Sequence, residues 1–126
     1  MGNYQEGLAV RREVLGADYV ERSIQSADEF TAPLQQLITE YCWGEIWTRD
    51  DLSRMTRSLI NIAMMTALNR PQELRLHVRG ALTNGCTVEE IRGVLLQAVV
   101  YCGVPAALDA FRVAGEVIRE ARSQAS

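Results

Sequence analysis

A succession of helix start and stop signals, with no alternating apolar run between them, constrains the fold of this chain more than any other feature. Thr87-Val88-Glu89-Glu90 is a capping box, and Pro71 and Asn84-Gly85 are residue types typical of a helix's first turn and of its C-terminal cap. No segment alternates apolar and polar residues in the manner of a half-buried strand. The sequence therefore predicts an all-α fold, a compact helical domain of about six to seven helices.

The predicted helices differ in how much apolar surface they carry. Ser26 and Glu29 have the spacing of a capping box, which predicts that a helix starts at Ser26. The segment 52–68 is apolar on nearly all sides, as expected for the central core helix. The predicted helices are 4–15, 26–41, 52–68, 71–84, 87–101 and 105–122. The segment 48–51 is the predicted start signal of the helix 52–68, and residues 123–126 are expected to fray. All these helices are expected to belong to a single domain, 1–126.

Composition and charge exclude several classes of function. The net charge is −3, which gives no broad attraction to nucleic acid or to an anionic membrane. All 13 basic residues are arginines, so no side chain can form a Schiff base. No secretory signal or membrane span is recognisable. Three widely spaced cysteines, Cys42, Cys86 and Cys102, are typical of reduced thiols packed in a core, so we expect a cytoplasmic protein.

His77 is the only histidine, and it follows Glu73 by four residues in a predicted helix. This spacing places an imidazole and a carboxylate on the same helix face. The carboxylate could fix the tautomer of the ring and stabilise its charged form, as in a general acid or base. The pair could equally be a solvated or structural hydrogen bond, and both interpretations stay open.

Two further groups of residues could line a site. Arg54, Arg57, Ser58 and Asn61 recur at helical spacing along the core helix, where an arginine needs a partner. That partner could be Glu45 or Glu73 in an internal salt bridge, or a substrate carboxylate held by a guanidinium clamp.

The run Trp43-Gly44-Glu45-Ile46-Trp47 places two indoles around a carboxylate. The tryptophans could be core or interface anchors, or the walls of a pocket.

One histidine and no cysteine cluster argue against a zinc site, and neither a phosphate-binding glycine loop nor a nucleophile elbow is present. The remaining options are cofactor-free acid–base chemistry around His77, or no catalysis.

Several blocks of the sequence together resemble the carboxymuconolactone decarboxylase family, of the alkylhydroperoxidase D-like superfamily. The resemblance extends from about residue 15 to about residue 113, and its blocks are WGEIW (43–47), TRSLI (56–60), ALNR (67–70), ELRLH (73–77), NG (84–85) and YCGVPAA (101–107). It implies an all-helical, cofactor-free lyase that assembles as a homo-oligomer, usually a hexamer. The peroxidases of the superfamily carry Cys-x-x-Cys-x-x-x-His. Arg70 and Glu73 stand at those two cysteine positions here, so thiol peroxidase activity is not expected.

The resemblance also implies a reaction and roles for residues. Decarboxylation of 4-carboxymuconolactone, in the protocatechuate branch of the β-ketoadipate pathway, leaves electrons that delocalise onto the lactone oxygen, so the substrate is its own electron sink. The expected catalytic residues are His77, Glu73 and Glu45, and the expected residues for the dicarboxylate substrate are Arg57, Arg54, Arg70, Trp43 and Trp47. No metal is expected. The alternatives are a related lyase or isomerase acting on another lactone or β-keto acid, and a non-catalytic helical oligomer.

Overall fold

The computed structural model describes residues 3–125 and is all-α. Within those residues it contains seven α-helices, one π-helical segment and no strand, which confirms the predicted fold class. The chain divides into two compact units, the first ending at Ser53 and the second beginning at Arg54. The prediction of a single domain stays a prediction.

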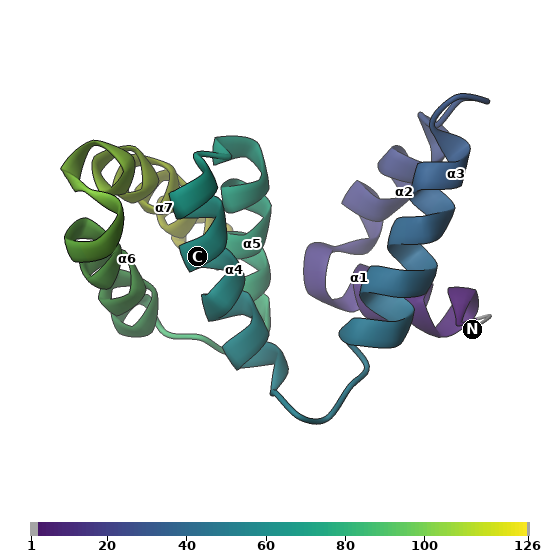
Figure 1. Ribbon diagram of the computed structural model, residues 1–126, viewed down its shortest axis with the longest axis horizontal. Coiled ribbons are helices and arrows are strands. Elements are labelled where there is room, and N and C mark those ends of the chain that lie inside the picture. Colours follow the sequence, from purple (N-terminus) through teal and green to yellow (C-terminus); the bar gives the residue numbers. More distant parts are fainter. Residues whose placement is uncertain (1–2, 126) are drawn as a thin grey trace. The chain divides into compact units, whose positions relative to one another are not determined.

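The first unit is built on a close contact between two helices. It contains α1 (Tyr4–Leu15), α2 (Ala17–Gln25), α3 (Ala32–Leu37) and the π-helical segment η1 (Ile38–Ile46), which continues α3. Helix α1 lies against η1, with α2 beside α1 (Figure 1). Gly7 permits this approach, because a Cβ atom there would lie 2.1 Å from the carbonyl oxygen of Thr39. The π-helical turn is set by bonds such as Trp47 N–H to the Cys42 carbonyl, at 3.0 Å.

The predicted helix start at Ser26 is wrong. Ser26 is the C-cap of α2, a helix that was not predicted, and α3 begins only at Ala32. Asp28 and Thr31 instead close a turn, in which the Thr31 amide donates to Asp28 Oδ1 at 2.9 Å and the Asp28 amide donates to Thr31 Oγ1 at 3.0 Å. Short polar side chains of this kind stabilise turns as readily as helix starts. The spacing of Ser26 and Glu29 therefore does not by itself establish a helix start.

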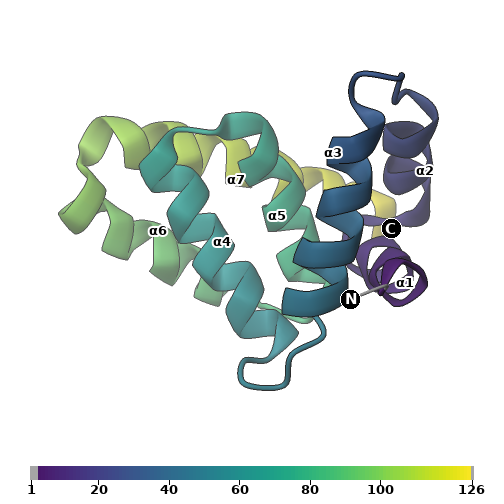
Figure 2. The ribbon, with the colours of Figure 1, turned by 45° about the vertical axis from the view of Figure 1, so that its right-hand side comes forward.

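The second unit is a four-helix arrangement of α4 (Arg54–Leu68), α5 (Pro71–Thr83), α6 (Val88–Cys102) and α7 (Val104–Ala125). Helix α4 packs against α5 and α6, and α7 packs against the same two helices, so the four close around one core. Figure 2 shows α4 between α5 and α6. The core combines large and small side chains from all four helices and the α5–α6 loop: Ile62, Leu74, Val78, Ala81, Cys86, Ile91, Leu95, Ala110, Ala114 and Val117.

Several predicted helix ends in the second unit are confirmed. Pro71 opens α5, Asn84 is its C-cap, and Gly85 follows with a φ of 94°. Thr87 and Glu90 form the predicted capping box of α6. Two expectations are wrong: the signal at 48–51 does not start α4, which begins at Arg54, and the tail does not fray from residue 123, since α7 continues to Ala125.

Helix α4 is not buried on all sides. Ser58, Ile62 and Thr66 form its buried stripe, whereas Ile60, Met64 and Leu68 are exposed. Helix α4 thus contributes to the four-helix core from one face, and the apolar side chains on its other face form an exposed apolar surface in the chain by itself.

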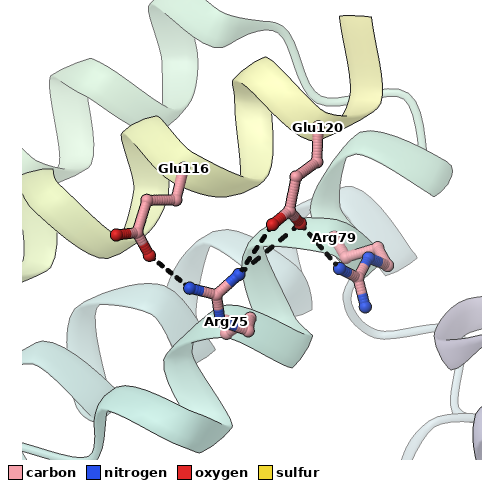
Figure 3. Close-up of polar contacts among 4 residues, drawn as sticks. All are labelled: Arg75, Arg79, Glu116 and Glu120. Carbon is pink, nitrogen blue, oxygen red and sulfur yellow. Dashed lines mark hydrogen bonds and ion pairs between the residues drawn. The ribbon is translucent and has the colours of Figure 1, made fainter. Parts of the chain in front are cut away.

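Ion pairs join the exposed sides of α5 and α7. Arg75 lies between Glu116, to which its Nη2 bonds, and Glu120, whose Oε2 is 3.3 Å from Arg75 Nη1 (Figure 3). Arg79 adds a contact of 3.2 Å to Glu120. Half-exposed pairs of this kind contribute modestly to stability. They do, however, pair the α7 carboxylates Glu116 and Glu120 with the α5 arginines Arg75 and Arg79.

The cysteines correct another expectation. Cys42 and Cys102 are exposed, so only Cys86 is a core residue, and its thiol donates to the Met55 carbonyl at 3.5 Å. Burial raises the pKa of the Cys86 thiol, which lowers its reactivity. Among residues 3–125, no helix has the length and apolar character needed to cross a membrane.

Candidate active site

The imidazole of His77 lies in the seam between α4 and α5. Helix α5 starts at Pro71 after Asn69, which adopts a left-handed φ of 58° that asparagine tolerates. Two turns into α5, the half-buried His77 ring faces Asn61 of α4, with 3.5 Å between Asn61 Nδ2 and His77 Nδ1. Nearer the end of the same seam, Asn84 Nδ2 donates to the buried Ser58 Oγ at 2.9 Å. The polar line predicted on α4 therefore partly faces α5.

Glu73 is close to His77 but bonds to another residue. Its Oε1 lies 3.3 Å from Arg70 Nε, an i, i+3 ion pair at the start of α5. Among the described residues, Glu73 makes no hydrogen bond to His77, although its charge acts on the ring through space. The two positions where the peroxidase relatives would hold cysteines are thus joined here by an ion pair. Negative charge in the first turn is also favoured by the helix dipole.

Burial lowers the pKa of His77 below its ordinary value of 6.5, and the carboxylate of Glu73 opposes this only in part. Desolvation disfavours the charged imidazolium, so the neutral ring prevails near pH 7. A neutral imidazole can accept a proton on one nitrogen and donate a hydrogen bond from the other. The site is therefore suited to a hydrogen bond to a developing oxyanion, or to accepting a proton, more than to holding a permanent cation.

The arginines expected to bind carboxylates have different surroundings. Arg57 is half-buried on α4, one turn before Asn61, and its Nε atom is buried. Arg54 is exposed in the first turn of α4, and Arg70 is exposed and paired with Glu73. Arg57 is therefore the least exposed of the three arginines, and a partly desolvated guanidinium binds a carboxylate more strongly than an exposed one.

The other three predicted site residues belong to the first unit. Trp43 and Trp47 are buried and stack on each other, with ring centroids 4.6 Å apart. Glu45 is half-buried between them in sequence, and its Oε1 accepts a hydrogen bond of 2.8 Å from Asn3 Nδ2. Gly44 is required here, since a Cβ atom would lie 2.6 Å from the Asn3 carbonyl oxygen. The indoles therefore anchor the first unit and fix the backbone around Glu45.

A cavity of about 580 Å³ opens between α4 and α6, and its lining is apolar and contains no charged side chain. Leu59, Ile60, Val94 and Tyr101 are among the residues that line it, and His77 does not line it. A dicarboxylate would find no counter-charge there. Among the described residues, no group of three or more His, Cys, Asp or Glu side chains comes together as metal ligands would.

The structure thus places Glu73 and His77 one turn apart on α5 and pairs Glu73 with Arg70 at the N-cap of that helix. Arg57 and Arg54 belong to α4, whereas Trp43, Trp47 and Glu45 belong to the first unit. The structure adds Asn61 as the residue in contact with the ring. The sequence offered a signal for Asn61, because an amide at helical spacing from Arg57 stood out in an apolar helix. Only the α4–α5 packing reveals its partner.

A half-buried histidine with a lowered pKa, held between two helices of an all-helical chain, defines a class of helical proteins suited to acid–base chemistry. The profile of the Carboxymuconolactone decarboxylase family matches residues 32–116, and the chain belongs to this family. It is 44% identical over 117 residues to a nitrosuccinic acid decarboxylase of Metarhizium robertsii, a match covering 93% of this chain and 82% of the relative. It is 42% identical over 117 residues to a 4-carboxymuconolactone decarboxylase of Acinetobacter baylyi, covering 93% of this chain and 87% of the relative. These relatives support a decarboxylase role.

Proposed function

We propose that the protein decarboxylates 4-carboxymuconolactone to the enol-lactone of 3-oxoadipate, without a cofactor. The observation that carries the proposal is the extended match to a decarboxylase of that name, together with a half-buried, neutral His77 in the α4–α5 seam. The reaction would belong to protocatechuate catabolism and take place in the cytoplasm.

The reaction requires the protein only to bind the substrate, to stabilise the developing oxyanion and to deliver one proton. Loss of carbon dioxide leaves an electron pair that moves through the ring double bond onto the lactone carbonyl oxygen. The resulting dienolate accepts one proton at the α-carbon. A hydrogen-bond donor near the developing oxyanion stabilises the transition state, and it does so most effectively in a partly desolvated site. The substrate itself supplies the electron sink, so the protein's task is electrostatic.

In this proposal the neutral His77 donates a hydrogen bond to the carbonyl oxygen, or it takes up a proton from solvent and passes that proton to the α-carbon, and Glu73 tunes the ring through its charge. Arg57 clamps a substrate carboxylate, with Arg54 or Arg70 as the second cation. Glu45, between Trp43 and Trp47, would share the proton transfer.

A second candidate substrate is nitrosuccinic acid, and the specific observation that favours it is the 44% identity to a decarboxylase acting on that compound. Nitrosuccinate is also a dicarboxylate with a carboxylate on an activated carbon. Its decarboxylation places the electrons on the nitro oxygens as a nitronate. Both substrates therefore require an oxyanion donor, a cation for the retained carboxylate and one proton for carbon. A site built from His77 and arginine suits either.

Assembly is part of the proposal. The exposed apolar residues of α4, among them Ile60, Met64 and Leu68, would be covered in a homo-oligomer, which the family resemblance predicts to be a hexamer. Light scattering at micromolar protein would show a species several times the 14.1 kDa chain. A monomer would contradict this part of the proposal and leave the reaction itself to the assay below.

The test is a direct comparison of the two substrates. The lactone is generated in place from protocatechuate by the two preceding enzymes, nitrosuccinate is supplied as the free acid, and carbon dioxide release is followed for each. We expect kcat/KM for the lactone to exceed that for nitrosuccinate by at least about 100-fold, or 2.7 kcal/mol in transition-state binding. The reverse order would assign nitrosuccinate, and no release from either compound would overturn the decarboxylase proposal.

A further inference from the structure

We propose that Asn61 is a positioning residue that selects the tautomer of His77. Its Nδ2 lies 3.5 Å from His77 Nδ1, and an amide nitrogen can only donate. With the amide in the orientation that the structure gives it, Nδ2 donates and Nδ1 accepts with its lone pair, which places the single proton of the neutral ring on Nε2. The consequence for catalysis rests on the proposed decarboxylase function, whereas the tautomer assignment does not.

The packing of α4 on α5 holds the amide and the ring in place. One turn from Asn61 on α4, the Ser58 hydroxyl accepts a 2.9 Å bond from Asn84, which fixes α4 against the end of α5. Ile62, next to Asn61, is fully buried in the core. The backbone that carries the Asn61 side chain is therefore held in place on both sides. The 3.5 Å contact between that side chain and His77 is at the long end of hydrogen-bond distances.

Among the residues that the structure describes in this unit, the charged neighbours of His77 do not compete with Asn61 for the tautomer. Glu73, the charged neighbour on α5, is held by Arg70. Arg57, the charged residue one turn from Asn61 on α4, is a cation and cannot accept a proton from the ring. On the other side of α5, the α7 carboxylates Glu116 and Glu120 bond to Arg75. Asn61 is thus the polar group in contact with Nδ1.

The selected tautomer has a chemical use. A proton on Nε2 points away from Asn61, where it can be donated to the oxyanion formed as carbon dioxide leaves. The opposite tautomer would present a lone pair to that oxyanion and repel it. Asn61 would act through His77 without touching the substrate, much as partner groups fix the tautomer of histidines in other sites.

The test is nitrogen-15 NMR of the full-length protein with labelled histidine, in which His77 gives the only side-chain signals because the chain has one histidine. At pH 7.5 we expect a protonated Nε2 and an unprotonated Nδ1. Asn61→Leu should yield a mixture of tautomers. Asn61→Asp should move the proton to Nδ1 and raise the pKa of His77. Ser58→Ala, the control that loses the neighbouring bond between the same helices, should keep the wild-type tautomer.

A proton on Nδ1 in the wild type, or identical spectra in wild type and Asn61→Leu, would overturn the proposal. The activity readout is separate: on the substrate that the wild type turns over, Asn61→Leu should lower kcat about tenfold with little change in KM. In Asn61→Asp the acid limb of the pH–rate profile should move to higher pH. An inactive wild type with the expected spectrum would refute the proposed function and leave the assignment of Asn61 intact.

Discussion

Replacing Gly7 by alanine tests how closely α1 and η1 approach. A Cβ atom at position 7 would lie 2.1 Å from the Thr39 carbonyl oxygen and 2.8 Å from the Gly44 amide nitrogen. Both are backbone atoms, so no side-chain rotation relieves the clash. Thr39 is fully buried, and its hydroxyl accepts from Arg11 Nη1 at 3.1 Å. The helices must therefore separate by about 1 Å and loosen this bond.

The magnitude follows from two opposing terms. Overpacking a well-packed contact costs about 1–3 kcal/mol, and a clash between two backbones belongs at the upper end, about 3 kcal/mol. Alanine gains about 1 kcal/mol over glycine in helix propensity, which offsets part of this cost. We therefore expect Gly7→Ala to destabilise the first unit by about 2 kcal/mol.

Urea unfolding followed by tryptophan fluorescence measures this effect, because both tryptophans of the chain, Trp43 and Trp47, lie in the first unit. A loss of 2 kcal/mol lowers the midpoint by about 1 M or more. Gly93→Ala on α6 is the matched control: a Cβ atom there has nothing within 4 Å, so circular dichroism should show a gain of about 0.5–1 kcal/mol. A Gly7→Ala midpoint at or above the wild-type value would refute the packing argument.

Three more outcomes are expected. Arg57→Lys should lower kcat/KM strongly with little change in melting temperature, because the forked guanidinium is lost; a large melting shift with normal kinetics would instead indicate an internal salt bridge. Folding lowers the pKa of His77 below its ordinary value of 6.5, so the unfolded chain binds more protons than the folded chain at pH values between the folded and the unfolded pKa. Stability should therefore be complete above pH 6.5 and fall as the pH drops through that window, and an equal slope in His77→Gln would contradict the assignment. Alkylation should modify Cys42 and Cys102 before Cys86 and leave turnover intact, and activity lost without unfolding would restore a thiol role.

Sequence reasoning predicted the second unit better than the first. The capping box at Thr87 and the proline at 71 act within a single helical turn, so local sequence suffices to place the helix ends. Ser26 carried the same kind of signal but ended a helix, because the Asp28–Thr31 turn satisfied the local backbone instead. The segment Ile38–Ile46 packs against α1, and the apolar periodicity of the sequence does not indicate its π-helical form.

For the candidate site, too, local sequence predicted some features, and others depend on tertiary packing. The spacing of Glu73 and His77 placed both residues on one helix face, as the structure has them. That Glu73 bonds to Arg70 instead of the imidazole, and that Asn61 contacts the ring, depends on side-chain choices between neighbouring residues and on how α4 packs against α5. Periodicity narrows the candidates to a face, and tertiary packing then selects the partner.

The central claim is that His77 acts in a decarboxylation, and its most direct test is carbon dioxide release from the lactone by wild type and His77→Ala under identical conditions. Removing a group that acts in the transition state should lower kcat and kcat/KM together by about 10²–10⁴-fold. Circular dichroism and light scattering should show the variant folded and assembled as the wild type is. We expect rapid release of carbon dioxide from wild type and nearly none from His77→Ala. Release at the wild-type rate from the variant would contradict this claim.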